Sequence, residues 1–260
     1  MDISTKENMK KYIVALIGPG IVLVALITSV LAGFGSKWEW WHFRDGFVIL
    51  KYGVFIAIFG LATTSVVVFY FITESKNLMY VSFVAMAVSV FIIITPVRYS
   101  NKMQKYPMIH EITTDIGDPP LFTTLAPIRT GATNSAEYDV MHGDRLVQME
   151  NYNDIRTLLI KFDKKEGFDI AYKIAKDMGW DIVYSNRTEG AIEAIDTTFW
   201  FGFKDDVSVR IRRSGPENIK VDMRSLSRVG RGDAGKNAER VREFLSKVKK
   251  EIEKASRKKG

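Results

Sequence analysis

The sequence has 260 residues, a net charge of +7 and no cysteine. The lack of cysteine excludes structural disulfides, thiolate metal sites and a cysteine nucleophile. Residues 101–260 are numerous enough for one compact soluble domain with its own core, whereas residues 1–100 have a different, strongly apolar composition.

Three uncharged apolar stretches occupy the first hundred residues: Tyr12–Phe34, Tyr52–Thr73 and Leu78–Val97. The second has an apolar lead-in from Phe47 and is predicted to span residues 47–73. About 20 helical residues cover the roughly 30 Å hydrocarbon core of a bilayer. Helices buried in a soluble protein would usually carry charges on one face. The sequence therefore predicts three transmembrane helices in residues 1–100, with the lipid bilayer as a partner.

The basic residues on the two sides of the predicted spans, four against five, do not decide the orientation, but the two lysines before the first span favour one. Lys10 and Lys11 directly precede the first span, and basic residues tend to stay on the cytoplasmic side. Three spans then place the C-terminal part across the membrane. We expect a multi-pass protein of the inner (cytoplasmic) membrane with a cytoplasmic N-terminus and a periplasmic or otherwise extracytoplasmic domain in the cell envelope.

The connection after the first span is dense in aromatic residues. It reads Trp38-Glu39-Trp40-Trp41-His42-Phe43, which is typical of the aromatic belt at a membrane–water interface. A second interpretation is a docking surface for a membrane protein partner at Trp38–Trp41.

The soluble part, residues 101–260, begins with a loop-rich segment, 101–153, and continues with a predicted helix at 164–178. Phe168, Ala171 and Ala175 recur there at helical spacing. Alternation of apolar and polar residues then predicts strands at Trp180–Ser185, Ala191–Phe203, Val207–Arg213 and Ile219–Leu226. A closing helix begins near Asp233. The predicted fold is α+β, an antiparallel sheet of three to five strands covered by helices.

The closing helix is basic, with ten Lys or Arg and four acidic residues from Lys236 onward. A solvated face explains this better than nucleic-acid binding, because the run lacks the series of interleaved aromatic residues on which bases stack. We expect no nucleic-acid partner.

A glycine-rich segment between the last strand and the closing helix is a candidate ligand site. Gly230 and Gly235-Lys236 match P-loop spacing, but Asn237 stands where Ser or Thr should hold magnesium. The free backbone N–H groups of a helix start can instead bind an anion. The candidate ligand-binding residues are Arg224, Arg228, Arg231, Asp233 and Asn237. The alternative is that the arginines pair with Asp222, Asp205 or Asp206 and fix the hairpin to the helix.

The candidate catalytic residues are His110, Asp115 and Glu193. His110 with Asp115 offers two metal ligands, a base and its orienting carboxylate, or a structural tie between loop and sheet. Glu193 shares a strand face with apolar residues, so we expect burial and a partner such as Arg210 or Arg224. The only histidines are His42, His110 and His142, which argues against a multi-histidine metal site, and we expect no cofactor.

Four separated blocks of the soluble part occur together in one family. They are His110–Asp115 with Asp118–Phe122, Glu193-Ala194, Gly202–Val207 and Asp222–Ala238. In this set the chain resembles a bacterial and plastid family known only as domain of unknown function fourteen ninety-nine. Glu111 stands where that family more often has Asp, and Arg231–Ala234 departs from its commoner Ser-Asp-Leu. The resemblance implies no activity; members are often membrane-anchored or exported.

The leading functional hypothesis is a membrane-anchored binding or interaction module that recognises an anionic small molecule or lipid headgroup without turnover. The alternatives are an envelope enzyme, a hydrolase or lipid-modifying protein that uses His110, Asp115 and Glu193, and a scaffold subunit of a membrane complex.

Overall fold

The structure is a computed structural model that describes residues 3–71, 75–138 and 143–258. Residues 72 and 73 of the second predicted span, and His142, lie outside the described residues. Contacts divide the chain into two units. The first comprises residues 1–102 and 199–202, and the second comprises residues 103–198 and 203–260.

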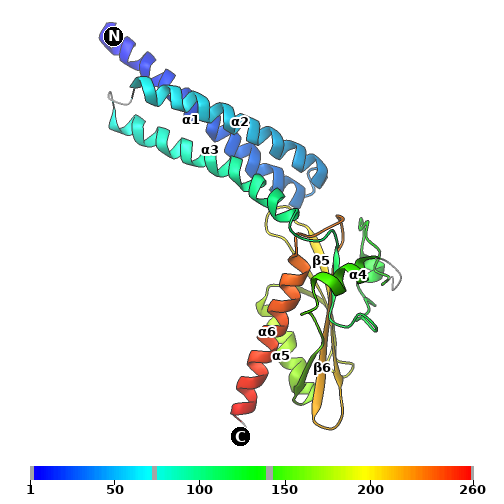
Figure 1. The fold of residues 1–260 in the computed structure, drawn as a ribbon. Helices are drawn as coiled ribbons and strands as arrows, with labels where there is room; N and C mark the ends of the chain where they lie inside the picture. The colour runs from blue at the N-terminus through cyan, green and yellow to red at the C-terminus, as the bar shows by residue number, and fades with distance from the viewer. Residues whose placement is uncertain (1–2, 72–74, 139–142, 259–260) are drawn as a thin grey trace. The chain divides into compact units, whose positions relative to one another are not determined.

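The first unit contains three long helices, α1 (Ile3–Lys37), α2 (Phe43–Phe71) and α3 (Lys76–Met103) (Figure 1). Each is long and apolar enough to cross a membrane, and many of the large apolar side chains on each are exposed. The three predicted spans are therefore confirmed as helices of this kind. The helices extend past the apolar stretches because polar residues at their ends continue the helical hydrogen bonds.

Small residues let α1 and α2 approach closely. A Cβ at Gly18 would overlap Thr64 of α2, and one at Gly60 would overlap Val22 of α1. Within a bilayer, helix association depends on such close van der Waals packing, because lipid is as apolar as the side chains. The helix α3 also turns small residues inward and buries Ser82 and Ala85 among others.

The second unit contains one antiparallel sheet of six strands in the order β1-β6-β5-β4-β3, with β2 also paired to β6. The strands are β1 (Glu111–Thr113), β2 (Leu158–Lys161), β3 (Asp181–Asn186), β4 (Ala191–Thr197), β5 (Lys204–Arg213) and β6 (Asn218–Ser227). The long hairpin of β5 and β6 forms the centre, in a register that sets Arg210 opposite Asp222.

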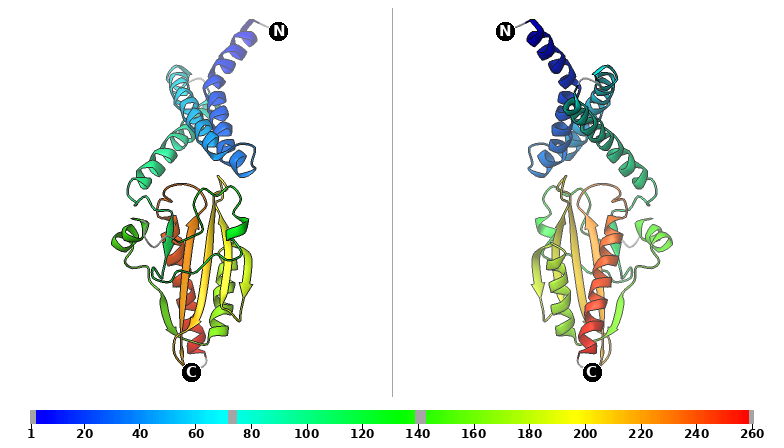
Figure 2. Two further views of the ribbon diagram at one scale, coloured as in Figure 1. Left: turned by 90° about the vertical axis from the view of Figure 1, so that its right-hand side faces the viewer. Right: turned by 90° about the vertical axis from the view of Figure 1, so that its left-hand side faces the viewer.

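Two helices, α5 (Lys164–Asp177) and α6 (Lys236–Arg257), cover one face of the sheet (Figure 2). Side chains alternate along a strand, so Val207, Val209 and Ile211 of β5 point into the hydrophobic core under these helices. From α6, Phe244 enters the same core and stacks on Trp180, with ring centroids 5.2 Å apart. The predicted α+β class is confirmed.

The structure differs from the predicted elements in several places. The strand β5 begins at Lys204 rather than Val207. The sheet has six strands rather than three to five, because β1 and β2 have only three and four residues and are too short to show alternation. The strand predicted at Ala191–Phe203 ends at Thr197, where a turn closes with Thr198 N–H donating to the Phe203 carbonyl. The helix α6 begins at Lys236 instead of near Asp233.

The short helix α4 (Gly143–Asn151) is joined to β1 through one side chain. The Gln148 amide donates from Nε2 to the Thr113 carbonyl at 2.6 Å and accepts the Thr113 N–H on Oε1 at 3.1 Å. Gln148 thus takes the place that the backbone of a neighbouring strand would occupy.

The other face of the sheet lies under an extended segment, Thr114–Tyr138, which we call the cover segment. It includes one short 3₁₀ helix, η1 (Ala126–Ile128), and packs a small apolar cluster of Phe122 and Leu125 against Leu226. Polar contacts also join this face to the cover segment, for example from Arg210 to the Asp118 carbonyl and from Ser208 to the Leu121 carbonyl, and they form the candidate site.

Candidate functional site

Alternation places a series of charged side chains on the face beneath the cover segment. The outward positions that flank Val207, Val209 and Ile211 in β5 are Asp206, Ser208, Arg210 and Arg212, and those of β6 are Asp222, Arg224 and Leu226. The neighbouring strands add Glu111 and Glu193 to this face. Because burial of an unpaired charge is costly, the arrangement of these groups determines what the face can bind.

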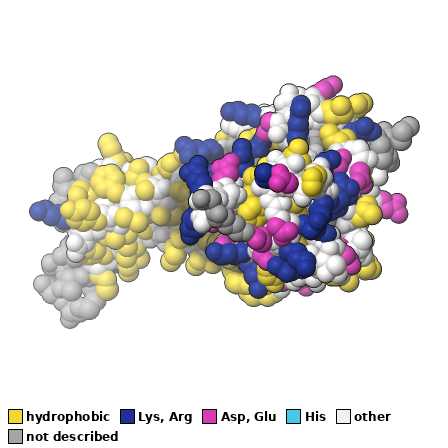
Figure 3. Space-filling view, turned by 90° about the horizontal axis from the view of Figure 1, so that it is seen from below, with side chains coloured by type: hydrophobic (Ala, Val, Ile, Leu, Met, Phe, Trp, Pro, Cys, Tyr) yellow, Lys and Arg dark blue, Asp and Glu magenta, His cyan; other side chains and the backbone are white. Residues whose placement is uncertain are grey.

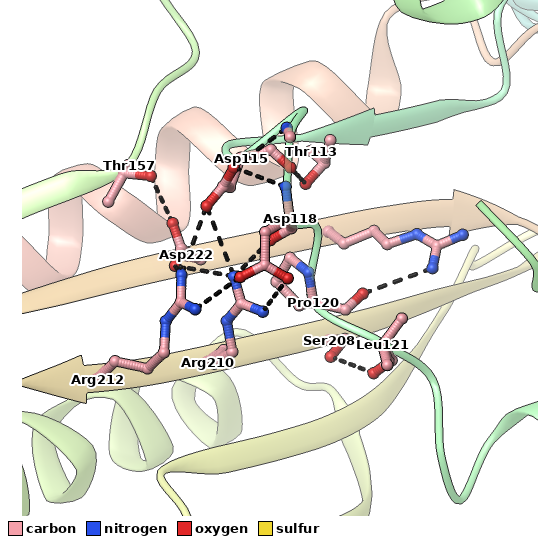
Figure 4. Close-up of polar contacts among 12 residues, drawn as sticks. Thr113, Asp115, Asp118, Pro120, Leu121, Thr157, Ser208, Arg210, Arg212 and Asp222 are labelled. Carbon is pink, nitrogen blue, oxygen red and sulfur yellow. Dashed lines mark hydrogen bonds and ion pairs between the residues drawn. The ribbon is translucent and has the colours of Figure 1, made fainter. Parts of the chain in front are cut away.

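Five residues form the first charged group, which we call the Asp222 cluster: Asp115, Asp118, Arg210, Arg212 and Asp222. Asp222 Oδ2 lies 3.3 Å from Arg210 Nη2 and 3.2 Å from Arg212 Nη2 (Figure 4). Its Oδ1 accepts the Thr157 hydroxyl at 2.5 Å. The buried Asp222 is therefore shared by two arginines that also reach the two aspartates of the cover segment.

Asp118 is the outer member of this cluster, with 63% of its side chain exposed. Its Oδ2 accepts from Arg212 Nη1 at 2.7 Å. The hydrogen bond from Arg212, followed by the charge of Arg210, lowers the pKa of Asp118 below its usual value. Arg210 also donates to the Asp118 carbonyl, so the cluster holds this end of the cover segment in place.

Three residues form the second group, which we call the Asp206 cluster: Arg129, Asp206 and Arg228. Arg228 donates from Nε and Nη2 to Asp206 Oδ1 at 3.0 and 2.8 Å. Arg129, which comes from the cover segment directly after η1, places its Nε 2.9 Å from Asp206 Oδ2. Two arginines thus share one carboxylate, and that carboxylate is fully buried.

Arg129 is poorly satisfied within this cluster. Its side chain is only 4% exposed, yet all three guanidinium nitrogens lack a hydrogen bond of good geometry to any residue that the structure describes. Burial lowers the pKa of Arg129, and the positive charges of Arg228 and Arg224 lower it further, against the opposing effect of Asp206. Buried polar groups without partners are rare in native proteins, so this guanidinium needs an explanation.

The backbone holds Arg129 over Arg228. The N–H groups of Thr133 and Asn134 donate to the Arg228 carbonyl at 2.9 and 3.1 Å. The Asn134 side chain donates to the carbonyls of Ser227 and Gly230 at 2.8 and 2.9 Å. The position of Arg129 is therefore set by the path of the cover segment rather than by its own side-chain contacts.

Arg224 lies beside this cluster and is fully engaged. It pairs with Glu111 through Nε and donates from Nη2 to the Ala136 carbonyl at 2.9 Å. The rings of Phe122 and Tyr138 lie 4.7 and 5.3 Å from its guanidinium carbon, within cation–π range. Burial, and secondly the negative charge of Glu111, raises the pKa of Tyr138.

Glu193 is buried in β4, as expected, but its partners differ from the expected Arg210 or Arg224. Its carboxylate accepts the backbone N–H groups of Thr123 at 2.8 Å and Leu125 at 2.8 Å, together with the Thr123 hydroxyl at 2.5 Å. The Thr124 N–H lies 3.1 Å from both oxygens. The residue therefore binds three successive backbone N–H groups directly before η1, and few of its lone pairs remain for proton transfer.

The structure places the predicted ligand-binding residues on different surfaces. Arg224 and Arg228 lie beneath the cover segment, whereas the Asn237 side chain contacts Ser225 and Ser227 on the helix-covered face. Arg231 is exposed. These residues do not converge on one cavity, because consecutive residues of β6 point to opposite faces.

Asp233, a predicted ligand-binding residue, stabilises the start of α6. It accepts the Gly235 and Asn237 N–H groups at 2.8 and 2.5 Å, and burial raises its pKa. The alternative was that the arginines pair with Asp222, Asp205 or Asp206 and fix the hairpin to the helix. Arg228 does pair with Asp206, but this pair lies within the β5–β6 hairpin and does not reach α6. A further arginine, Arg240 of α6, binds Asp196 and Asp205 at 2.7 and 2.6 Å and joins the helix to the sheet.

The candidate catalytic pair is not assembled as a base and its orienting carboxylate. The His110 carbonyl accepts from Ser227 N–H at 2.9 Å, which brings the two motif blocks side by side. Asp115, however, binds the Gly117 and Asp118 N–H groups through Oδ1 and lies near Arg210 and Arg212 through Oδ2. Among the described residues no group of three or more potential ligands could hold a metal ion.

Four residues that define the clusters were not among the ligand-binding candidates predicted from the sequence: Arg129, Asp206, Arg210 and Arg212. The alternation in β5 could have placed Asp206, Arg210 and Arg212 on one face. No local pattern identifies Arg129, because an irregular segment positions it. The basic surplus of α6 marks no single patch: on the face that Figure 3 shows, charges of both signs are interspersed over the soluble part.

Comparison with known families identifies the soluble part. A family model described as a protein of unknown function (DUF1499) matches residues 111–248, which is more than half of the chain. No curated protein matches the sequence. The matched range contains the strands, the cover segment and most of α6, so the chain, with its three helices long and apolar enough to span a membrane, belongs to the DUF1499 family.

Proposed function

We propose that the protein is a membrane-anchored module that binds an anionic ligand beneath the cover segment and does not turn it over. The observation that carries this proposal is Arg129, a buried guanidinium without hydrogen-bond partners among the described residues. Arg228 and Arg129 share the single carboxylate of Asp206, so an added anion would find both charge and donors there.

The enzyme alternative has less support than binding. The carboxylate of Glu193 accepts four donors from Thr123, Thr124 and Leu125, and a base must keep a lone pair for the proton it takes. Asp115 is likewise engaged by arginines and backbone N–H groups. The scaffold alternative keeps its original basis, since Trp38 and Trp40 are 52% and 61% exposed.

The proposed location is the inner membrane, with the DUF1499 domain on the extracytoplasmic side. Lys10 and Lys11 before the first span support this orientation. Cysteine accessibility would test it: a cysteine introduced at the exposed position Ser135 should react in intact cells with a membrane-impermeant maleimide. Labelling only after lysis would place the domain in the cytoplasm.

The binding proposal is tested by thermal unfolding of the full-length protein in neutral detergent. Phosphate, sulfate, acetate and a soluble phosphodiester are added at constant ionic strength, with chloride as the reference. A ligand that binds only the folded state raises its stability, so at least one anion should raise the unfolding midpoint by several degrees. Equal midpoints in all five salts would contradict anion binding.

A further inference from the structure

The Asp206 cluster has an excess of one positive charge. Arg129 and Arg228 contribute two, and Asp206 contributes one negative charge. The neighbouring Arg224–Glu111 pair adds no net charge. Because uncompensated buried charge is unfavourable, the cluster is matched to a ligand group with one negative charge.

The donors that remain in this cluster are numerous and close together. Arg129 Nη1 and Nη2 have no hydrogen-bond partner, and Arg228 uses only Nε and Nη2 in the bonds it makes with described residues. Each Nη atom carries two hydrogens, so these three atoms present six N–H donors. They lie on two guanidinium groups that contact the same carboxylate.

The donor count favours a phosphoryl group over a carboxylate. A carboxylate offers two oxygens, whereas a phosphoryl group offers more oxygens around one centre, and planar guanidinium groups bind such oxygens in pairs. The required single charge agrees with a phosphodiester or a singly ionised phosphate. Both a lipid headgroup and a soluble compound contain this chemistry.

Access to the cluster runs through the cover segment. The turn that follows Arg129 is exposed at Thr130 and Gly131, and Gly131 has the left-handed φ of 73°. The Arg129 side chain itself is only 4% exposed, so a ligand reaches it only if part of the cover segment moves. Binding requires this turn to move, while Asn134 still fixes the segment to Ser227 and Gly230.

We propose that Arg129 and Arg228 form a phosphoryl-binding site that recognises a phosphodiester or phosphate group. This inference rests on the proposed function and gives its ligand class and its location. Arg129 contacts the phosphoryl oxygens, Arg228 contributes Nη1, and Asp206 orients both guanidinium groups.

The test compares Arg129→Met with the parent in the detergent-solubilised full chain. The probes are inorganic phosphate, glycerophosphoglycerol, short-chain phosphatidylglycerol and acetate. Replacement of an unsatisfied buried guanidinium by an apolar side chain should leave the ligand-free midpoint unchanged or higher. The affinity for phosphate and glycerophosphoglycerol should fall at least about tenfold. Arg129→Lys, which keeps the charge but not the planar pair of donors, should also lose affinity.

Arg187→Met is the matched control, because Arg187 loses the same charge on the exposed surface, where it pairs with Asp169. The Arg187→Met variant should bind inorganic phosphate and glycerophosphoglycerol with the affinity of the parent. A response to phosphatidylglycerol alone, lost in Arg129→Met, supports the site and assigns the ligand to lipid. A response to acetate alone overturns the ligand class. A midpoint several degrees lower in ligand-free Arg129→Met overturns the site, because Arg129 would then be structural.

The outcomes also separate this inference from the proposed function. If no anion stabilises the parent, the binding function itself is wrong. If phosphate binding persists in Arg129→Met but is lost in Arg212→Met, anion binding stands and the site lies in the Asp222 cluster instead.

Discussion

The Asp222 and Asp206 clusters lie on the same face of one sheet but differ in how their charges are balanced. In the first, three carboxylates surround two arginines, and Asp118 and Arg212 lie open to solvent. In the second, two buried arginines share one carboxylate. The comparison shows that a surplus of carboxylates gives each arginine of the Asp222 cluster an acidic partner, whereas a surplus of arginines leaves the guanidinium nitrogens of Arg129 without hydrogen-bond partners among the described residues.

Among substitutions that test this comparison, Asp206→Asn should cause the largest loss of folding stability. The change leaves Arg129 and Arg228 buried without a countercharge, which typically costs about 3–5 kcal/mol of folding free energy. Hydrogen exchange of β5 and β6 peptides in the full-length protein would measure the loss. A cost as small as that of Asp118→Asn, the same chemical change at an exposed position, would show that Asp206 is not the centre of its cluster.

A smaller effect is expected from Asp222→Asn. Asp222 is as deeply buried as Asp206, but Arg210 and Arg212 keep Asp115 and Asp118 as partners. We expect a loss of about 2 kcal/mol, mainly from weakened hydrogen bonds to Thr157 and the arginines. The same exchange measurement applies. If Asp222→Asn costs as much as Asp206→Asn, burial rather than charge balance determines the difference between the clusters.

The smallest effect, and one that depends on pH, is expected from Asp118→Asn. Because Arg212 and Arg210 lower the pKa of Asp118, its stabilising contribution is present above the unfolded pKa, near 4, and is lost as the pH falls through the lower folded value. An exposed pair contributes no more than about 1 kcal/mol. Unfolding midpoints between pH 6 and pH 2 should therefore fall slightly more in the parent than in Asp118→Asn, and parallel curves would contradict the assignment.

Elements with a strong periodic signal were predictable from the sequence. The three apolar helices, α5, α6 and the β5–β6 hairpin follow directly from hydrophobic spacing. The strands β1 and β2 were not predictable, because three or four residues carry no period and their pairing depends on β6. Tertiary contacts, rather than local preference, define them.

The candidate site was predictable only in part. Arg224 and Arg228 were identified from the segment that precedes α6, and their pairing with acidic residues was foreseen as an alternative. That Asp233 and Asn237 bind the same ligand as these arginines stays a prediction. The alternation in β6 does not favour it, since Asn237 binds Ser225 on the opposite face of the sheet. Arg129 could not be predicted as a site residue. It is far from Arg228 in the sequence, and only the folded path of the cover segment brings the two side chains together.

The side-chain amide of Gln148 has a consequence for chains that share a bilayer. Molecules confined to two dimensions collide often, and an open strand edge invites the same edge of a neighbour to add to it. At Thr113 both backbone hydrogen-bonding positions on the outer side are already filled by Gln148. At this position of the β1 edge, a strand of a second copy therefore meets a backbone donor and acceptor that are already engaged.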